Sequence, residues 1–426
     1  MTGPHSSPHR PSQGEAPFAA EELFFSRTDP RGVIQAGNTV FQRVSDHPWN
    51  KLLGAPHKII RHKDMPRGAF HLMWAAIKGG DPVGVYVKNH ARDGLHYWVF
   101  AIVVPLKDGF LSVRLKPLSP LLQEVEADYA ALAARERAND LAPEAAEALL
   151  LERLAEHGHR GYRTFMTHAL AAEMEARDAR LGRHSPPWLG PFRTMLEAVS
   201  DVSEQTRELS AVFESIRGIP YNMRILASRL EAAGGPISVI SANYGILSEE
   251  ISGWMRSFAG GDGGAFSDIR DAVERALFVQ CAACLLEEMG ERFAAEEGLQ
   301  GHVDVAAETR MLADQGRAFA AAAEDGVAQV ARKAEKFSQA VRDMKRLITG
   351  LGATRMMCKI EGARLRNSGD NLVSVIRQLD QFQENIEERL QRINERNRMV
   401  QRMAETLTGG PAETGPAERA ARLAAE

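Results

Sequence analysis

The sequence predicts an α+β fold class, in which an N-terminal sheet domain precedes a long all-α region. Composition changes near position 120: the chain before it is rich in Gly, Val and aromatic residues, and the chain after it in Ala, Glu, Arg and Leu. The second composition is typical of long helices. Apolar residues alternate before the change, which predicts strands, and recur at spacings of three and four after it, which predicts helices.

The length of 426 residues is enough for two or three domains. Residues 1–20 are polar and Pro-rich, and residues 408–426 are Gly/Pro-rich and then charged, so we expect disordered ends. Between them we expect a sheet domain over residues 21–119, a helical connector over 120–190, and a helical bundle or coiled coil over 191–407.

Composition excludes several classes of protein. A net charge of −4 gives no basic surface for nucleic acid. The sequence has no run of ~20 apolar residues, so we expect no membrane span. Its three cysteines are an odd, sparse set that fits a reducing cytoplasm. We interpret Cys281 and Cys284 as buried small residues in a helix, not as a metal or redox pair. Because no cysteine precedes position 281, a cysteinyl-flavin adduct in the first domain is excluded.

The first domain begins with two short strands, expected at residues 23–26 and 32–35 around a turn at residues 29–32. Asn38 can cap the helix that follows. A second helix and three alternating segments with Gly-containing turns come next, which predicts three antiparallel strands. A five-stranded sheet of this kind has one face on its helices and leaves the other for a partner.

A cluster of polar residues lies between the two expected helices. Arg61, His62 and Asp64 occupy four positions before Met65-Pro66, and an amphipathic helix follows with Phe70, Met73, Trp74 and Ile77 on one buried face. Arg61 can pair with a phosphate or a ring oxygen, and Trp74 offers a stacking face. The alternative is a surface ion pair, a loop histidine and an ordinary core tryptophan.

The order of elements and these residues resemble the PAS fold, and the match is closest to the flavin-binding PAS domain of aerotaxis receptors. The resemblance covers roughly residues 28–116 and is carried by TDPRGVIQAGNTVF, GAPHKIIRHKDMPRGAFHLMW, VKNHARDGLHYWV and VPLKDGFL. In that family the domain binds FAD non-covalently and senses a redox state linked to oxygen and respiration. The resemblance implies FAD contacts at Asn38, Arg61, His62, Asp64, Trp74 and Asn89.

The sequence departs from the family at Pro82-Val83-Gly84, where an aromatic-Thr-Gly segment usually leads into the third strand. A haem alternative also remains, because His57 and His62 flank the polar cluster and either could ligate iron. The Arg61–Asp64 cluster suits FAD better, since haem needs one well-placed imidazole in an apolar pocket.

Helices are expected after position 120 at residues 121–139, 143–157 and 162–181, with Ser119 as the N-cap of the first. Charged residues in 144–181 have helical spacing, and we interpret them as solvated faces without a site. Further on, heptad-like stripes on either side of Gly234-Gly235-Pro236 predict an antiparallel hairpin with a first arm roughly 60 Å long. A second unit has its turn at residues 367–370.

These two turns faintly resemble the hairpin tip of chemoreceptor signalling domains. Matching positions are Asn222, Leu226, Ala227 and Glu231 in the first unit and Ile360, Glu361, Ala363 and Arg364 in the second. Pro220 and Pro236 interrupt the first unit, and the family's Gly-Glu-x-Gly-Arg-Gly-Phe tip is absent from the sequence. In the family that tip engages a histidine kinase and its coupling protein. An unrelated helical bundle is the alternative.

The leading hypothesis is a soluble, cytoplasmic redox or oxygen sensor of the aerotaxis type. It would use FAD in a PAS domain and act through the helical region. Expected partners are a signalling kinase with its coupling protein, or other chemoreceptor-like proteins, and we expect a homo-oligomer. Because Gly234-Gly235-Pro236 and residues 367–370 replace the tips, we expect no tight binding of the kinase. A cofactor-free scaffold and a haem-binding gas sensor are the alternatives. We expect no enzyme, because the sequence shows no nucleophile–base pair, metal-ligand spacing or phosphate loop.

Overall fold

The computed structural model describes residues 10–216, 218–228, 234–259, 264–299, 301–364 and 369–409. Of the two expected disordered ends, residues 1–9 and 410–426 lie outside these residues, as do Glu231 and the turn residues Asn367 and Ser368. Residues 10–20 are described, and Ala16 and Phe18 are buried. The chain forms two compact units. Unit 1 comprises Met1–Pro186 and Glu274–Ala323, and unit 2 comprises Pro187–Val273 and Glu324–Glu426.

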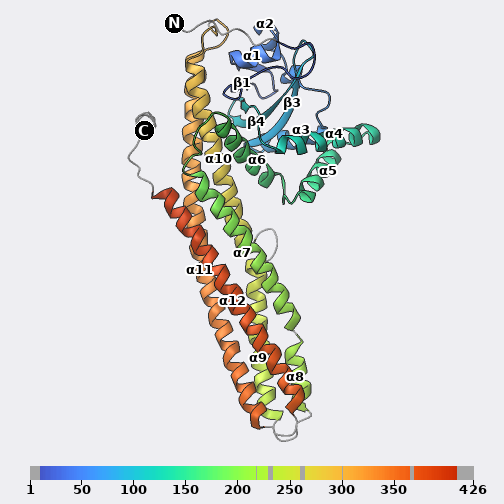
Figure 1. Ribbon diagram of the computed structural model, residues 1–426, viewed down its shortest axis with the longest axis vertical. Helices are drawn as coiled ribbons and strands as arrows, with labels where there is room; N and C mark the ends of the chain where they lie inside the picture. The colour runs from blue at the N-terminus through green and yellow to red at the C-terminus, as the bar shows by residue number, and fades with distance from the viewer. Residues whose placement is uncertain are drawn as a thin grey trace. The chain divides into compact units, whose positions relative to one another are not determined.

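Unit 1 contains an antiparallel sheet, whose strands β1, β3 and β4 are labelled in Figure 1. The sheet has five strands in the order β2-β1-β5-β4-β3. The strands are β1 (Phe24–Thr28), β2 (Ile34–Gly37), β3 (Val83–His90), β4 (His96–Leu106) and β5 (Gly109–Leu115). Four short helical segments lie between β2 and β3: α1 (Thr39–Ser45), α2 (Trp49–Leu52), η1 (His57–Ile60) and α3 (Arg67–Lys78). The predicted five-stranded antiparallel sheet with short helices is therefore confirmed.

Local chemistry explains the first two turns of this domain. The Asp29 carboxylate accepts hydrogen bonds from the backbone N–H groups of Arg31 (2.8 Å) and Val33 (2.9 Å), which closes the turn between β1 and β2. Gly32 adopts a φ of 77°, a conformation that glycine tolerates. Asn38 caps α1 as predicted, because its side chain accepts from the Phe41 N–H.

The connector forms α4 (Leu121–Asn139), α5 (Pro143–Glu156) and α6 (Tyr162–Arg180), close to the predicted ranges. Side chains of α4, α6 and the unit 1 part of α10 (Ala265–Ala294) pack on the sheet face opposite α3. Ring contacts join Trp98 to Tyr129, Tyr86 to Phe165, and Phe25 to Phe293. The expectation that this face stays free for a partner is therefore wrong, since the chain covers it with its own helices.

Two charged residues of α6 depart from the predicted solvated face. Glu173 is fully buried and accepts from the Tyr86 hydroxyl (2.6 Å) and from the backbone N–H groups of Leu118 and Ser119. The Ser119 hydroxyl also donates to Glu173 instead of capping its own helix. Arg177 is buried and binds Glu288 of α10 at 2.7 Å. These side chains attach the connector to the sheet domain and to α10.

Unit 2 is built from α7 (Leu189–Ile216), α8 (Ile219–Ser228), α9 (Gly234–Ala259), the first residues of α10, most of α11 (Val305–Arg364), and α12 (Gly369–Thr408). The predicted first arm is divided between α7 and α8, just before Pro220. Arg396 pairs with Asp201, and the Phe382 ring packs on Phe213, so α12 runs antiparallel to α7. Buried Asn397 donates to the Ala334 carbonyl at 2.8 Å, which joins α12 to α11. The helices thus pack antiparallel, as predicted for the bundle, but α12 of the second predicted unit lies on α7 of the first.

No helix in the described parts of the chain is both long and apolar enough to cross a membrane.

Candidate cofactor site

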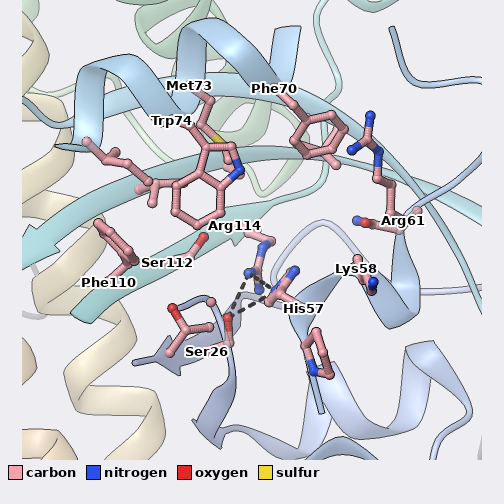
Figure 2. Close-up of a pocket in the computed structure, with 18 of the residues that line it drawn as sticks. Ser26, His57, Lys58, Arg61, Phe70, Met73, Trp74, Phe110, Ser112 and Arg114 are labelled. Carbon is pink, nitrogen blue, oxygen red and sulfur yellow. Dashed lines mark hydrogen bonds between the residues drawn. The ribbon is translucent and has the colours of Figure 1, made fainter. Parts of the chain in front are cut away.

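A cavity of about 330 Å³ lies between α3 and the inner face of the sheet in unit 1 (Figure 2). This volume is at the lower end of the range of about 300–1,000 Å³ for ligand pockets. Its lining includes apolar side chains of α3, β3, β4 and β5 and polar side chains of β1, η1 and β5. The residues are Ser26, Thr28, Arg31, Gly32, Pro56, His57, Lys58, Arg61, Phe70, Met73, Trp74, Ile77, Val87, Asn89, Ala101, Val103, Phe110, Ser112 and Arg114.

The apolar stripe of α3 forms one wall of this cavity. Phe70, Met73, Trp74 and Ile77 all line it, and the first three are only half-buried. The sequence pattern predicted a buried core face at these positions. A helix face that lines a cavity and one that packs in a core have the same spacing of apolar residues. Only the tertiary structure shows which of the two this face is.

The other side of α3 is fixed by the connector. Glu136 of α4 accepts from the backbone N–H groups of Arg67 (2.7 Å) and Gly68 (3.1 Å), so a carboxylate caps the start of α3. A Cβ atom on Gly68 would lie 2.5 Å from the backbone of Ala146 in α5, so the close approach of these helices requires glycine. Helices α4 and α5 thus hold the wall that carries Trp74.

Three of the six sequence-predicted site residues line the cavity: Arg61, Trp74 and Asn89. The Arg61 guanidinium carbon lies 3.8 Å from the centre of the Phe70 ring, and burial lowers the pKa of Arg61. Asn89 is buried on β3, and its backbone bridges that of Arg61. The structure therefore brings a cation, an amide and an indole to one cavity.

His62 and Asp64 are not among the lining residues and form a separate polar group. The Asp64 carboxylate binds the Lys88 ammonium at 3.1 Å, and the Asp64 N–H donates to His62 Nδ1 at 3.2 Å. Burial would raise the pKa of the Asp64 carboxyl, but the hydrogen bond from Lys88 and the neighbouring positive charges lower it. Burial and the Lys88 charge lower the pKa of His62. This group fixes the segment that positions Arg61.

Asn38 also lies outside the cavity. Its Oδ1 accepts from the Phe25 N–H (3.0 Å) and the Phe41 N–H (3.1 Å), and its Nδ2 donates to the Leu23 carbonyl (2.8 Å) and to Glu296 Oε1 (2.9 Å). The side chain is fully buried, and these four bonds use its hydrogen-bonding capacity. Asn38 organises β1 and α1 from behind the cavity lining.

Sequence reasoning missed the most buried cation of the cavity, Arg114 on β5. Its Nη2 donates to Ser26 Oγ and to His57 Nε2, each at 2.7 Å, as the dashed lines in Figure 2 show. Its Nη1, and the Oγ of neighbouring Ser112, are buried without a hydrogen-bond partner within the described residues. The alternation along β5, with Leu111, Val113 and Leu115 on one face, could have indicated that Ser112 and Arg114 share the other.

Burial and charge determine the protonation states of Arg114 and His57. Burial lowers the pKa of Arg114 to about 10, so the guanidinium stays charged at neutral pH. Burial and the Arg114 charge lower the pKa of His57 to about 3, so its imidazole is neutral and accepts at Nε2. The ring of His57 stacks on Phe41, with centroids 5.9 Å apart.

These contacts argue against haem in this cavity. His57 uses Nε2 toward Arg114, and His62 does not line the cavity. Flat apolar walls with an arginine, an amide and unpaired buried donors instead fit an aromatic ring that has an electron-rich edge, such as the ring of FAD.

No family model matches the sequence. A comparison with curated proteins shows similarity to the aerotaxis receptor of Escherichia coli (strain K12), which is 37% identical over 126 residues. The matched stretch is 28% of this chain and 25% of the receptor, so the chain spans about a quarter of the length of the curated relative that it matches. The chain, which has an N-terminal sheet domain and a long helical region, is thus similar to the aerotaxis receptor over those 126 residues.

Proposed function

We propose that the protein binds FAD in the cavity of unit 1 and acts as a redox or oxygen sensor of the aerotaxis type, not as an enzyme. The observation that carries this proposal is the meeting of Arg61, Trp74 and Asn89 at one apolar cavity. The similarity to the aerotaxis receptor supports the same function. FAD would supply a ring that changes charge and protonation when it is reduced.

The lining residues divide into two roles in this proposal. Trp74, Phe70 and Met73 cover the faces of the ring, while Arg61 and Asn89 donate to its polar atoms or to a phosphate. His62 and Asp64 belong to the proposed site because they hold in place the segment that carries Arg61. Asp64 contacts both His62 and Lys88 of β3. Asn38 acts from outside the lining, because it caps α1, and Phe41 of α1 stacks on His57.

A short route leads from the cavity to the helices. Successive side chains of a strand point to opposite faces of the sheet. On β1, Ser26 accepts from Arg114 at the cavity, and Arg27 on the other face binds Glu308 of α11 through a forked contact of 2.6–2.9 Å. A change of charge at the ring can thus shift β1, and β1 is attached to α11.

In this proposal residues 21–119 sense and residues 191–407 report. The reporting partners are a signalling kinase with its coupling protein, or other chemoreceptor-like proteins, and the protein acts as a homo-oligomer. Asn222 and Ile360, which match the chemoreceptor tip pattern, lie on α8 and α11, and both are exposed and available for such contacts.

The visible absorption spectrum of the purified full-length protein tests the cofactor. Flavin bands, or their appearance after incubation with FAD, are the expected result. A Soret band would instead support the haem alternative, and a colourless protein that takes up no FAD would support the cofactor-free scaffold.

A pull-down from cell extract with oxidised and with reduced protein tests the output. Redox-dependent capture of chemoreceptor-like proteins is the expected result, because the sequence lacks the tip that engages the kinase. Capture of the kinase and its coupling protein as the main species would contradict this expectation.

A further inference from the structure

We propose that Arg114 binds the electron-rich edge of the flavin ring through its free Nη1, together with Ser112 Oγ, and that this contact favours the reduced, negatively charged ring. The inference rests on the proposed FAD binding and adds a residue that the motif resemblance does not include. It concerns one end of the cavity, formed by β1, η1 and β5.

The first argument is the charge of the lining. Four basic residues line the cavity, namely Arg31, Lys58, Arg61 and Arg114, and none of the nineteen lining residues is acidic. Arg114 is 5% exposed, and its hydrogen-bond partners are the neutral groups of Ser26 and His57. A buried cation without a nearby anion is costly, because it gives up its hydration and gains no opposite charge. A ligand that brings electron density to this end removes that cost.

The second argument is the fixed orientation of the guanidinium. Ser26 and His57 hold Nη2 from one side, and the Phe41 ring centre lies 5.6 Å from the guanidinium carbon. His57 is held by its stack on Phe41, and Phe41 belongs to the capped helix α1. The remaining donors, Nη1 and Ser112 Oγ, are the ones without a partner in the described chain. Two preorganised donors at one end of a cavity select an acceptor-rich edge.

The chemistry of the ring provides such an edge. The flavin ring has a pyrimidine-dione side with two carbonyl oxygens and a ring nitrogen between one of them and the central ring. Uptake of two electrons and one proton from a chemical reductant such as dithionite leaves one net negative charge, which is shared by that nitrogen and the adjacent carbonyl oxygen. A guanidinium that donates to this edge binds the reduced ring more tightly than the oxidised ring.

The test measures binding and redox equilibrium in the full-length protein. The variants are Arg114→Gln, which removes the charge, Arg114→Lys, which keeps it, and Ser112→Ala, which removes the second donor. Arg92→Gln is the control, since Arg92 pairs with Asp46 at the surface and does not line the cavity. The dissociation constants of oxidised and of dithionite-reduced FAD are measured without oxygen, together with the midpoint potential of the bound ring.

The wild type and Arg92→Gln should bind reduced FAD more tightly than oxidised FAD. Arg114→Gln should lose at least about tenfold of that preference, which lowers the midpoint potential by about 30 mV for each tenfold. Arg114→Lys should retain part of the preference, and Ser112→Ala should lose less than Arg114→Gln. If Arg114→Gln does not fold, as circular dichroism would reveal, the Arg114→Lys and Ser112→Ala values decide.

The outcomes separate the two proposals. A wild type that binds no flavin overturns FAD binding, and this inference with it. A wild type that binds flavin, with Arg114 variants that keep the full preference for the reduced ring, overturns the role of Arg114 alone. A loss of preference that also occurs in Arg92→Gln is a general charge effect and counts against the inference.

Discussion

Asn38 Nδ2 donates a hydrogen bond to Glu296 Oε1 at 2.9 Å, across 258 positions of the sequence. The other oxygen of Glu296 accepts from the Thr39 N–H (2.8 Å) and the Thr39 hydroxyl (2.9 Å). Glu296, which follows α10, therefore completes the cap of α1. Asn38, which the family resemblance places at the cofactor, thus connects the sheet domain to the residues after α10.

Glu296→Gln should destabilise unit 1 by about 1–2 kcal/mol, because a charge-assisted cap at a helix N-terminus becomes a neutral one. Urea unfolding followed by circular dichroism gives the free energy, and hydrogen exchange of the α1 amides should locate the effect. Glu297→Gln is the matched control, since the neighbouring Glu297 is exposed. Equal stabilities of the two variants would show that the Glu296 cap contributes nothing.

Trp74→Ala should weaken FAD binding by about tenfold or more, because the mutation removes the stacking face and its contact with Phe110. The stability cost should be about 1–3 kcal/mol, less than for a fully buried aromatic, because Trp74 is half-buried at the cavity. The helices of unit 2 should remain folded, as their circular dichroism will show. Trp49→Ala, outside the cavity, should bind FAD normally, and a Trp74→Ala protein with unchanged affinity contradicts the stacking role.

The strands and most helices could be predicted because local periodicity determines them. The five strands, the Asn38 cap and the connector helices follow from alternation, turn residues and helical spacing. In the site, three of the six expected residues, Arg61, Trp74 and Asn89, line one cavity. Closeness in sequence does not decide this, since His62 and Asp64 lie beside Arg61 in the sequence but outside the lining.

The rest of the site depended on long-range pairing. Arg114 faces the cavity because β5 lies beside β1 in the sheet, which brings it to Ser26, 88 positions away. Glu173 and Arg177 looked like solvated residues because helical spacing cannot show that another segment covers them. Helices α6 and α10 cover the second face of the sheet although they lie far from its strands in the sequence. Local sequence patterns do not show such long-range packing.

Acid should destabilise the sheet domain through His57. Its pKa is lowered from an ordinary 6.5 to about 3, first by burial and then by Arg114. The folded state thus binds fewer protons than the unfolded state, so the stabilisation is complete above pH 6.5 and is lost as pH falls toward 3. Between pH 6.5 and 4.5, where most carboxylates stay charged, the loss should be about 2–3 kcal/mol.

Urea unfolding at several pH values checks this dependence, with His57→Gln as the comparison. Glutamine can still accept from Arg114 but does not titrate, so the stability of the variant should vary less over the same window. Identical pH profiles for the wild type and His57→Gln would mean that His57 does not control the acid sensitivity.

Arg27 and Glu308 supply the contact by which β1 should move α11. Glu308 is buried, its hydrogen bond raises the pKa of Arg27, and the two side chains form a forked ion pair. Arg27→Glu and Glu308→Arg should each destabilise unit 1 by about 1–3 kcal/mol, because each leaves like charges together at a partly buried site. The double exchange should recover much of this loss, as a double-mutant cycle in urea would show.

The same pair should carry the redox signal. In the proposed site, reduction of FAD would add negative charge near Arg114, which holds Ser26, and Ser26 is the neighbour of Arg27 on β1. We therefore expect hydrogen exchange at the start of α11, residues 305–323, to differ between oxidised and reduced protein. Arg27→Gln should keep FAD, since Arg27 does not line the cavity, but lose this difference. Arg92→Gln, which removes a surface ion pair with Asp46 and does not change the cavity lining, should keep the difference. If Arg27→Gln still shows the full redox-dependent change in α11, the signal leaves the sheet by another contact, and the joint at Asn38 and Glu296 becomes the next element to test.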